Sequence, residues 1–188
     1  NGGIAIYGAL IAGILTIYWY TKRKGISFAL ILDILAPAVL IAQSIGRWGN
    51  FMNQEAHGEE VSRVFLENLF LPEFIIEQMN INGIYYHPTF LYESLWSLAG
   101  FVLILFLRRK EQLLRVGEVM FTYVMWYSFG RFFIEGMRTD SLYLFGPIRV
   151  SQALSILLFL GAMVYWAYRR RNNYPPDPYY TDISRKRV

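Results

Sequence analysis

Long uninterrupted runs of apolar residues alternate with short polar segments along most of this sequence. Five runs, of about 17 to 26 residues each, are long enough to cross roughly 30 Å of hydrocarbon as a helix. They cover residues 4–20, 28–53, 88–107, 116–136 and 148–168. A helix satisfies its own backbone hydrogen bonds inside a bilayer, and the sequence lacks the alternating pattern of a membrane β-barrel. The pattern therefore predicts an all-α fold, a polytopic transmembrane helix bundle with five spans.

The composition agrees with a membrane protein. Hydrophobic residues occupy 55% of the 188 positions and aromatic residues 18%, while 17% are charged. Soluble domains usually carry a smaller hydrophobic fraction and a larger charged fraction. The sequence contains no cysteine, so this chain supplies no thiol nucleophile, disulfide or cysteine metal ligand. It starts with Asn1-Gly2-Gly3 and runs straight into an apolar segment. We therefore expect it to begin partway through a longer protein.

Basic residues gather on one side of the expected bundle. The clusters are Lys22-Arg23-Lys24, Arg108-Arg109-Lys110 and Arg169-Arg170-Arg171, which follow the first, third and fifth spans. The connection 54–87, in contrast, holds six glutamates and the single base Arg63. Because cytoplasmic loops carry an excess of Lys and Arg, we expect the C-terminal end to be cytoplasmic and residues 54–87 to lie outside.

This division predicts two regions. Residues 1–171 form a transmembrane helix-bundle domain, and residues 172–188, with three prolines and a basic end, form a flexible cytoplasmic tail that contacts anionic lipid. Within 54–87, apolar residues from Val61 to Met79 recur at helical spacing, which predicts an amphipathic interfacial helix that Pro72 bends or interrupts. Both a lid over a lipid site and a plain surface helix fit this pattern.

Charged side chains within a span are costly unless they are paired, so each one is a candidate functional residue. Arg47 lies late in the second span, among two glycines and several carboxamides. Its planar, permanently charged fork matches the oxygens of a phosphate, and low dielectric strengthens that match. Alternatively, Arg47 pairs with Glu55 or Glu135 and only locks helices together.

The fourth span carries a second polar set. Its members are Tyr127, Arg131, Glu135 and Arg138. A helix places these positions within one stripe about 80° wide. Arg131 and Glu135 come near the outer end of the span, at the expected depth of Arg47, so we expect two spans to converge on one site. A self-contained Arg131–Glu135 ladder is the structural alternative.

Other polar residues in or beside the spans are less specific. His87, at the outer start of the third span, fits either a helix cap or a base, whereas Glu93 needs a partner and can find one in an arginine. Asp33 and Glu118 lie near helix starts, where the helix dipole favours an acid, and we expect both to be structural. We expect no metal site, because the two histidines lie far apart in sequence.

Three motifs together resemble the prolipoprotein diacylglyceryl transferase family. They are Gly46-Arg-x-Gly-Asn-Phe-x-Asn-x-Glu55-x-x-Gly58, then His87-Pro88 with Leu91-Tyr92-Glu93, and then Tyr127-x-x-x-Arg131-x-x-x-Glu135-x-x-Arg138. The resemblance spans most of the chain, and the first motif is long and rich in defined positions. It implies a bundle of seven spans, with about two of them before Asn1.

The resemblance also implies an activity and a location. Family members transfer the diacylglyceryl group of phosphatidylglycerol to the lipobox cysteine thiol of a lipoprotein precursor, which forms a thioether and releases glycerol phosphate. The multi-pass enzyme lies in the bacterial cell membrane with its site toward the outer leaflet, and we expect neither a cofactor nor a nucleic-acid partner. By resemblance, Arg47 holds the lipid head group and Arg131 is essential. The motif positions expected to bind substrate are Asn50, Asn53, Glu55, Gly58, Tyr127 and Arg138, beside Glu135 as a catalytic residue.

One position departs from the family. Many members carry a histidine shortly after the initial Gly-Gly, often proposed as the base, and this chain has Tyr7 there. A tyrosine with an unperturbed pKa of about 10 is a poor base at neutral pH unless a nearby arginine lowers that pKa, in which case Tyr7 is itself a catalytic candidate. Otherwise Tyr7 positions substrate, while His87, Glu135 or the substrate thiolate itself handles the proton, and the sequence leaves the choice open.

Two other functional classes also fit arginines and carboxylates between helices. A transporter or channel would need a polar path across both halves of the bilayer, whereas the unusual residues here gather toward the outer end. A structural membrane subunit would need the buried pairs for stability alone.

Overall fold

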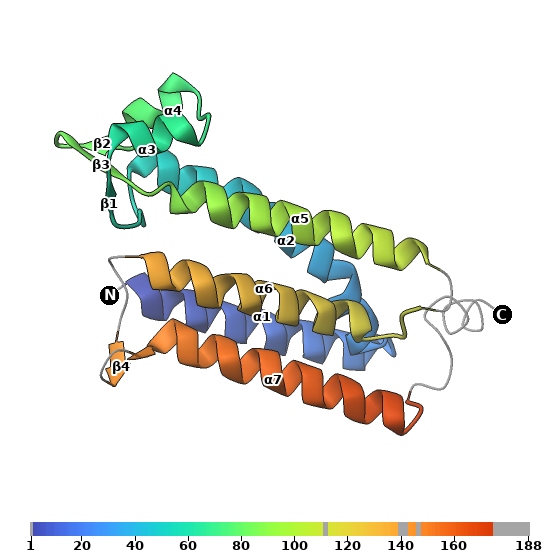
Figure 1. Cartoon of the computed structure of the whole chain (residues 1–188). Helices are drawn as coiled ribbons and strands as arrows, with labels where there is room; N and C mark the ends of the chain where they lie inside the picture. Colours follow the sequence, from blue (N-terminus) through green and yellow to red (C-terminus); the bar gives the residue numbers. More distant parts are fainter. Residues whose placement is uncertain (1, 111–112, 139–142, 146–147, 175–188) are drawn as a thin grey trace.

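The computed structural model describes residues 2–110, 113–138, 143–145 and 148–174. The side chains of residues 2–7, 143–145 and 148 lie outside this description, as does the expected tail from residue 175 onward. Figure 1 shows the chain as a set of long, roughly aligned helices with a smaller unit at one end.

All five predicted apolar runs form long helices, which confirms the helical bundle. These helices are α1 (Gly2–Lys24), α2 (Phe28–Asn53), α5 (Thr89–Arg109), α6 (Glu118–Met137) and α7 (Val150–Arg171). Within the described residues, three of them, α2, α5 and α7, are both long and apolar enough to cross a membrane. The expected count of five spans therefore remains a proposal as far as α1 and α6 are concerned.

The connection 54–87 folds into a small unit that we call the head. It contains helices α3 (Arg63–Asn68) and α4 (Glu73–Gln78) and strands β1 (Glu60–Val61), β2 (Asn80–Ile81) and β3 (Ile84–Tyr86). The strands form an antiparallel sheet in the order β1-β3-β2. A further antiparallel pair joins β4 (Tyr143–Phe145) to β5 (Ile148–Arg149) before α7.

The expected helical segment from Val61 to Met79 forms two short helices, α3 and α4, and the expected interruption at Pro72 is confirmed. Phe70 adopts a left-handed backbone conformation with φ of 53°, which ends the first helical segment, and Pro72 is the N-cap of the next one. Arg63 donates hydrogen bonds to Glu67, Tyr85 and Glu73, and these bonds, that to Glu67 above all, raise the pKa of its guanidinium. The head is thus a compact fold, which an amphipathic pattern alone did not predict.

Packing holds the head on the ends of α2 and α5. Its core contains Phe51 from α2 and Phe90 from α5 among buried head residues, namely Leu66, Ile75, Ile76 and Met79. Figure 1 shows α2 and α5 running side by side, with α6 between this pair and α7. The head therefore covers the same end of the bundle at which the charged residues of α2 and α6 were expected.

Two tryptophans fasten α5 to α6. Trp96 and Trp126 stack with ring centroids 4.2 Å apart, and each indole N–H donates to the backbone carbonyl of the other residue, at 3.0 and 2.9 Å. Gly130 and Gly100 lie under the two indoles, where an added Cβ would overlap ring atoms. This reciprocal contact fixes the register of the two helices.

The buried acids at the opposite end are structural, as expected, but Asp33 caps a different helix. Its carboxylate accepts hydrogen bonds from the backbone N–H groups of Gly117, at 2.5 Å, and Met120, at 2.9 Å, at the start of α6. Its own helix, α2, is capped by Ser27. Glu118 pairs with Arg170 at 2.5 Å. A helix dipole therefore does favour the charge of Asp33, but it is the dipole of α6 and not that of α2.

Candidate active site

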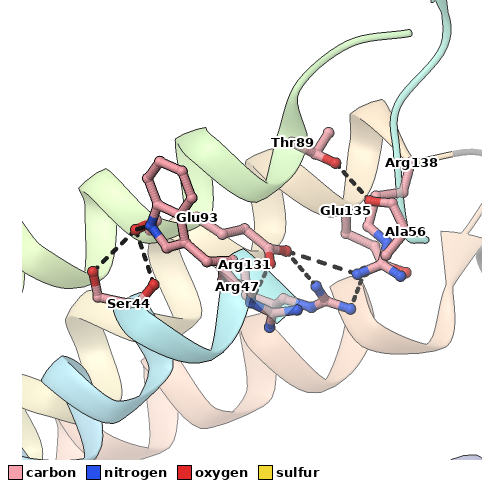
Figure 2. A network of polar contacts seen from close by, with 10 residues as sticks. Ser44, Arg47, Ala56, Thr89, Glu93, Arg131, Glu135 and Arg138 are labelled. Atoms are coloured by element: carbon pink, nitrogen blue, oxygen red, sulfur yellow. Dashed lines mark hydrogen bonds and ion pairs between the residues drawn. The ribbon is translucent and has the colours of Figure 1, made fainter. Parts of the chain in front are cut away.

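The side chain of Glu93, on α5, lies between arginines from two other helices (Figure 2). Its Oε2 atom is 2.5 Å from Nε of Arg47 on α2, and its Oε1 atom accepts a 2.8 Å hydrogen bond from Nη1 of Arg131 on α6. The Glu93 side chain is only 9% exposed. One carboxylate therefore joins three helices at a single point.

Two further residues complete what we call the arginine cluster. Nη2 of Arg131 lies 2.6 Å from Oε2 of Glu135, and Nη1 of Arg138 lies 3.8 Å from Oε1 of Glu93. Together with Arg47, three arginines face two carboxylates, and these five side chains carry one net positive charge. An anion with a single negative charge would balance them.

The helical spacing seen in the sequence explains half of this geometry. Arg131 and Glu135 lie one turn apart on α6, and Tyr127 lies one turn earlier on the same face. The other half depends on α5, because the ion pair of Arg47 is formed with Glu93 and not with Glu55 or Glu135. Glu93 was expected to need an arginine, and it contacts three, but it was not among the residues expected to form the site.

A small cavity opens beside the arginine cluster. Its walls include Arg47, Glu93, Tyr127 and Arg131, together with Gln43, Trp96, Ser97, Gly130 and Ile134. The volume is about 10 Å³, which is room for about one water molecule. In this conformation the carboxylate of Glu93 fills the position between the guanidinium groups of Arg47 and Arg131. No ligand-sized space remains there.

Asn50, Asn53 and Glu55 do not line this cavity. Asn50 and Glu55 border a second cavity of about 10 Å³ between the end of α2 and the head. There the backbone carbonyl of Asn50 accepts a 2.9 Å hydrogen bond from the Glu55 N–H, and Gln54 ends α2 in a left-handed conformation. Asn53 is exposed in the last turn of α2. Asn50, Asn53 and Glu55 therefore lie at the junction between the end of α2 and the head, and not in the cavity beside the arginine cluster.

Gly58 and His87 connect the head to the arginine cluster through the backbone. Gly58 forms an antiparallel bridge with Arg138, and its N–H donates to the His87 carbonyl at 3.0 Å. A Cβ at Gly58 would lie 2.6 Å from Cβ of His87, so only glycine allows this approach. Nδ1 of His87 lies 3.4 Å from the Tyr92 hydroxyl. His87 therefore borders the site and is not part of the arginine cluster.

Two positions bear on how well the sequence predicted the site. The side chain of Tyr7 lies outside the described residues, so its expected role in the site remains a prediction. Gln43 lines the cavity one turn before Arg47 and was not singled out. Its signal was available, since a carboxamide inside an apolar run is itself unusual.

The chemistry available at the cluster is anion binding in a partly buried environment, since the side chains of Arg47 and Arg131 are 24% and 19% exposed. Arginine forks that three helices hold in place can accept two oxygens of one phosphate through charge-assisted hydrogen bonds. The same forks would stabilise negative charge that develops on a leaving phosphate, because they need no reorganisation during the reaction.

Comparison with known proteins identifies the family of this chain. The sequence model of the family described as prolipoprotein diacylglyceryl transferase matches residues 1–168. Three similar proteins, all named phosphatidylglycerol–prolipoprotein diacylglyceryl transferase, come from Enterococcus faecalis, Ligilactobacillus salivarius and Listeria welshimeri. They are 58%, 57% and 60% identical to this chain over 172, 182 and 176 residues, respectively.

These alignments cover 92%, 97% and 94% of this chain and 62%, 67% and 62% of the respective relatives. The chain thus spans less than two thirds of the length of the Enterococcus and Listeria proteins. A family match over residues 1–168, together with relatives that are 57 to 60% identical, shows that the chain belongs to the prolipoprotein diacylglyceryl transferase family.

Proposed function

We propose that the protein transfers the diacylglyceryl group of phosphatidylglycerol to the lipobox cysteine thiol of a lipoprotein precursor, forming a thioether and releasing glycerol phosphate. The observation that carries the proposal is the position of Glu93. Its two carboxylate oxygens contact Arg47 and Arg131 separately, at 2.5 and 2.8 Å. The two non-bridging oxygens of a phosphodiester are spaced to make the same pair of contacts.

The charge of the cluster supports an anionic phospholipid as substrate. The five side chains carry one net positive charge, and a phosphatidylglycerol head group carries one negative charge. A zwitterionic head group would bring its own cation toward three arginines, which costs free energy in a site of low dielectric. The relatives' names specify phosphatidylglycerol as their lipid.

The proposed reaction is a displacement at carbon. The cysteine sulfur attacks the glycerol carbon that carries the phosphate, a C–S bond forms, and the C–O bond breaks with its electron pair on the phosphate oxygen. Arg47 and Arg131 stabilise this charge as it develops. The thiol proton leaves to a base, for which Glu135, His87 and the Tyr7 position are the candidates. Glu135 is the one that lies inside the arginine cluster.

The other motif positions keep substrate-binding roles within this proposal. Tyr127 and Arg138 lie at or beside the arginine cluster, which supports contact with the lipid head group. Asn50, Asn53, Glu55 and Gly58 lie at the junction between α2 and the head. That position suits the precursor peptide, which carries the acceptor cysteine.

We also propose that the bundle is a multi-pass protein of the bacterial cell membrane. Residues 1–171 form the membrane domain, the head lies outside, the arginine cluster faces the outer leaflet, and residues 172–188 form the cytoplasmic tail. The basic clusters at the ends of α1, α5 and α7 support this orientation, because Lys and Arg are retained on the cytoplasmic side.

The direct test is a transfer assay. Purified full-length protein, phosphatidylglycerol and a lipobox peptide are expected to yield a thioether-linked diacylglyceryl peptide, detected by mass spectrometry, without added nucleotide or metal. Phosphatidylcholine in place of phosphatidylglycerol is expected to give no product. Absence of product from folded protein would overturn the proposal.

The same assay separates catalysis from structure at Arg47. Arg47→Lys keeps a charge opposite Glu93 but loses the planar fork, so turnover should fall about a hundredfold while thermal unfolding stays nearly unchanged. Arg63→Lys, a matched change on the exposed surface of the head, should leave turnover unaffected. If Arg47→Lys turned over at the wild-type rate, Arg47 would not hold the head group.

A further inference from the structure

Gln43 is the one glutamine whose side chain lines the cavity beside the arginine cluster, among the described residues. It lies on α2 one turn before Arg47, so both side chains point to the same side of the helix. Its Nε2 group donates a 3.2 Å hydrogen bond to the Tyr123 hydroxyl. Its Oε1 atom is buried and has no hydrogen-bond partner among the described residues.

A buried amide oxygen without a partner is unfavourable, so its presence calls for an explanation. The cavity beside it has a volume of about 10 Å³, room for about one water-sized group. A hydroxyl has that size and supplies the hydrogen bond that a water would supply. An ammonium or methylated ammonium group is larger, and it would face the net positive charge of the arginine cluster.

We infer that Gln43 recognises a hydroxyl of the lipid head group and thereby selects a glycerol head group among anionic phospholipids. The inference rests on the proposed function, because it takes the lipid phosphate to lie at Arg47. The glycerol attached to that phosphate then extends along α2 toward Gln43. Tyr123 orients the amide, and either end of an amide can bond to a hydroxyl, which both donates and accepts.

The test compares two lipids in two proteins. Phosphatidylpropanol keeps the phosphate and the three head-group carbons of phosphatidylglycerol and lacks both hydroxyls. The wild-type protein should prefer phosphatidylglycerol in kcat/KM by about tenfold, the effect of one lost hydrogen bond to a buried group. Gln43→Leu should transfer from both lipids at similar kcat/KM, mainly because its KM for phosphatidylglycerol rises.

Two further variants keep the result interpretable. Gln152→Leu removes a similar amide, which donates to the Phe132 carbonyl on α6, and should leave the lipid preference unchanged. Tyr123→Phe keeps Gln43 and removes the hydroxyl that orients it, so the preference should fall to about threefold. If Gln43→Leu or Tyr123→Phe kept the full wild-type preference, the inference would be wrong.

A binding measurement distinguishes this inference from the proposed function. Phosphatidylglycerol should raise the thermal unfolding temperature of the wild-type protein more than phosphatidylpropanol does, and Gln43→Leu should abolish the difference. If the wild-type protein makes no product with either lipid, the proposed function fails and this thermal comparison still decides the role of Gln43. Equal stabilisation of the wild-type protein by the two lipids would overturn the inference.

Discussion

Glu93 shows how a residue can organise a site without belonging to its most recognisable motif. The carboxylate is 9% exposed and contacts Arg47 and Arg131 at 2.5 and 2.8 Å. Without it, two partly buried guanidinium groups from different helices would face each other without a counter-charge between them. Its negative charge therefore holds the two guanidinium groups together, and under the proposed function it holds them where the lipid phosphate would bind.

Replacing Glu93 tests this interpretation. Glu93→Gln keeps the shape and removes the charge, so the free energy of unfolding should fall by about 3 kcal/mol, the usual cost of breaking a buried ion pair. Glu67→Gln breaks an exposed pair with Arg63 and should change stability by less than about 1 kcal/mol. Denaturation of both variants in detergent measures the difference. Equal stability losses would show that Glu93 does not hold the arginines together.

At the scale of elements, the contact between α5 and α6 fixes the position of Glu93 relative to Arg131. The stacked indoles of Trp96 and Trp126 hydrogen bond to each other's backbone. This contact needs small residues beneath each ring, and Gly130 directly precedes Arg131. A change in the packing at Gly130 should therefore alter the position of Arg131 in the arginine cluster as well as the stability of the protein.

Gly130→Ala is the sharpest change at this contact. The added methyl would overlap the indole of Trp96, and overpacking of this kind costs about 1 to 3 kcal/mol of unfolding free energy. Gly161→Ala, on α7, meets no atom within 4 Å and should be neutral or slightly stabilising, since alanine favours helix. Thermal unfolding of the two variants decides the matter, and a Gly130→Ala protein as stable as the wild type would contradict the described packing.

At the scale of the whole molecule, the sequence predicted the long helices well because each one is a continuous apolar run. It predicted less of the head, since strands of two or three residues, such as β1 and β3, leave no periodic signal. The site shows the same division. Spacing along one helix placed Arg131 beside Glu135, whereas the contact of Arg47 with Glu93 depends on how α2 packs on α5.

Two residues make contacts that a local sequence motif does not predict. Asp33 was expected to serve the dipole of its own helix, and it caps α6 instead, through Gly117 and Met120. Gln43 stands out in the sequence only as a carboxamide within an apolar run, and the role proposed for it depends on a cavity that three helices form together. In both cases the decisive partner lies far away in the sequence, where local spacing carries no information.

The proposed function requires the arginine cluster to hold the phosphate of phosphatidylglycerol at the head end of the bundle. The most direct measurement is an experimental structure of the full-length protein in phosphatidylglycerol nanodiscs. We expect phosphate density within about 2.7 to 3.0 Å of the guanidinium groups of Arg47 and Arg131, with Glu93 moved away from at least one of them. A head group bound at the opposite end, near Arg108 and Arg169, with the Arg47–Glu93 pair intact, would contradict it.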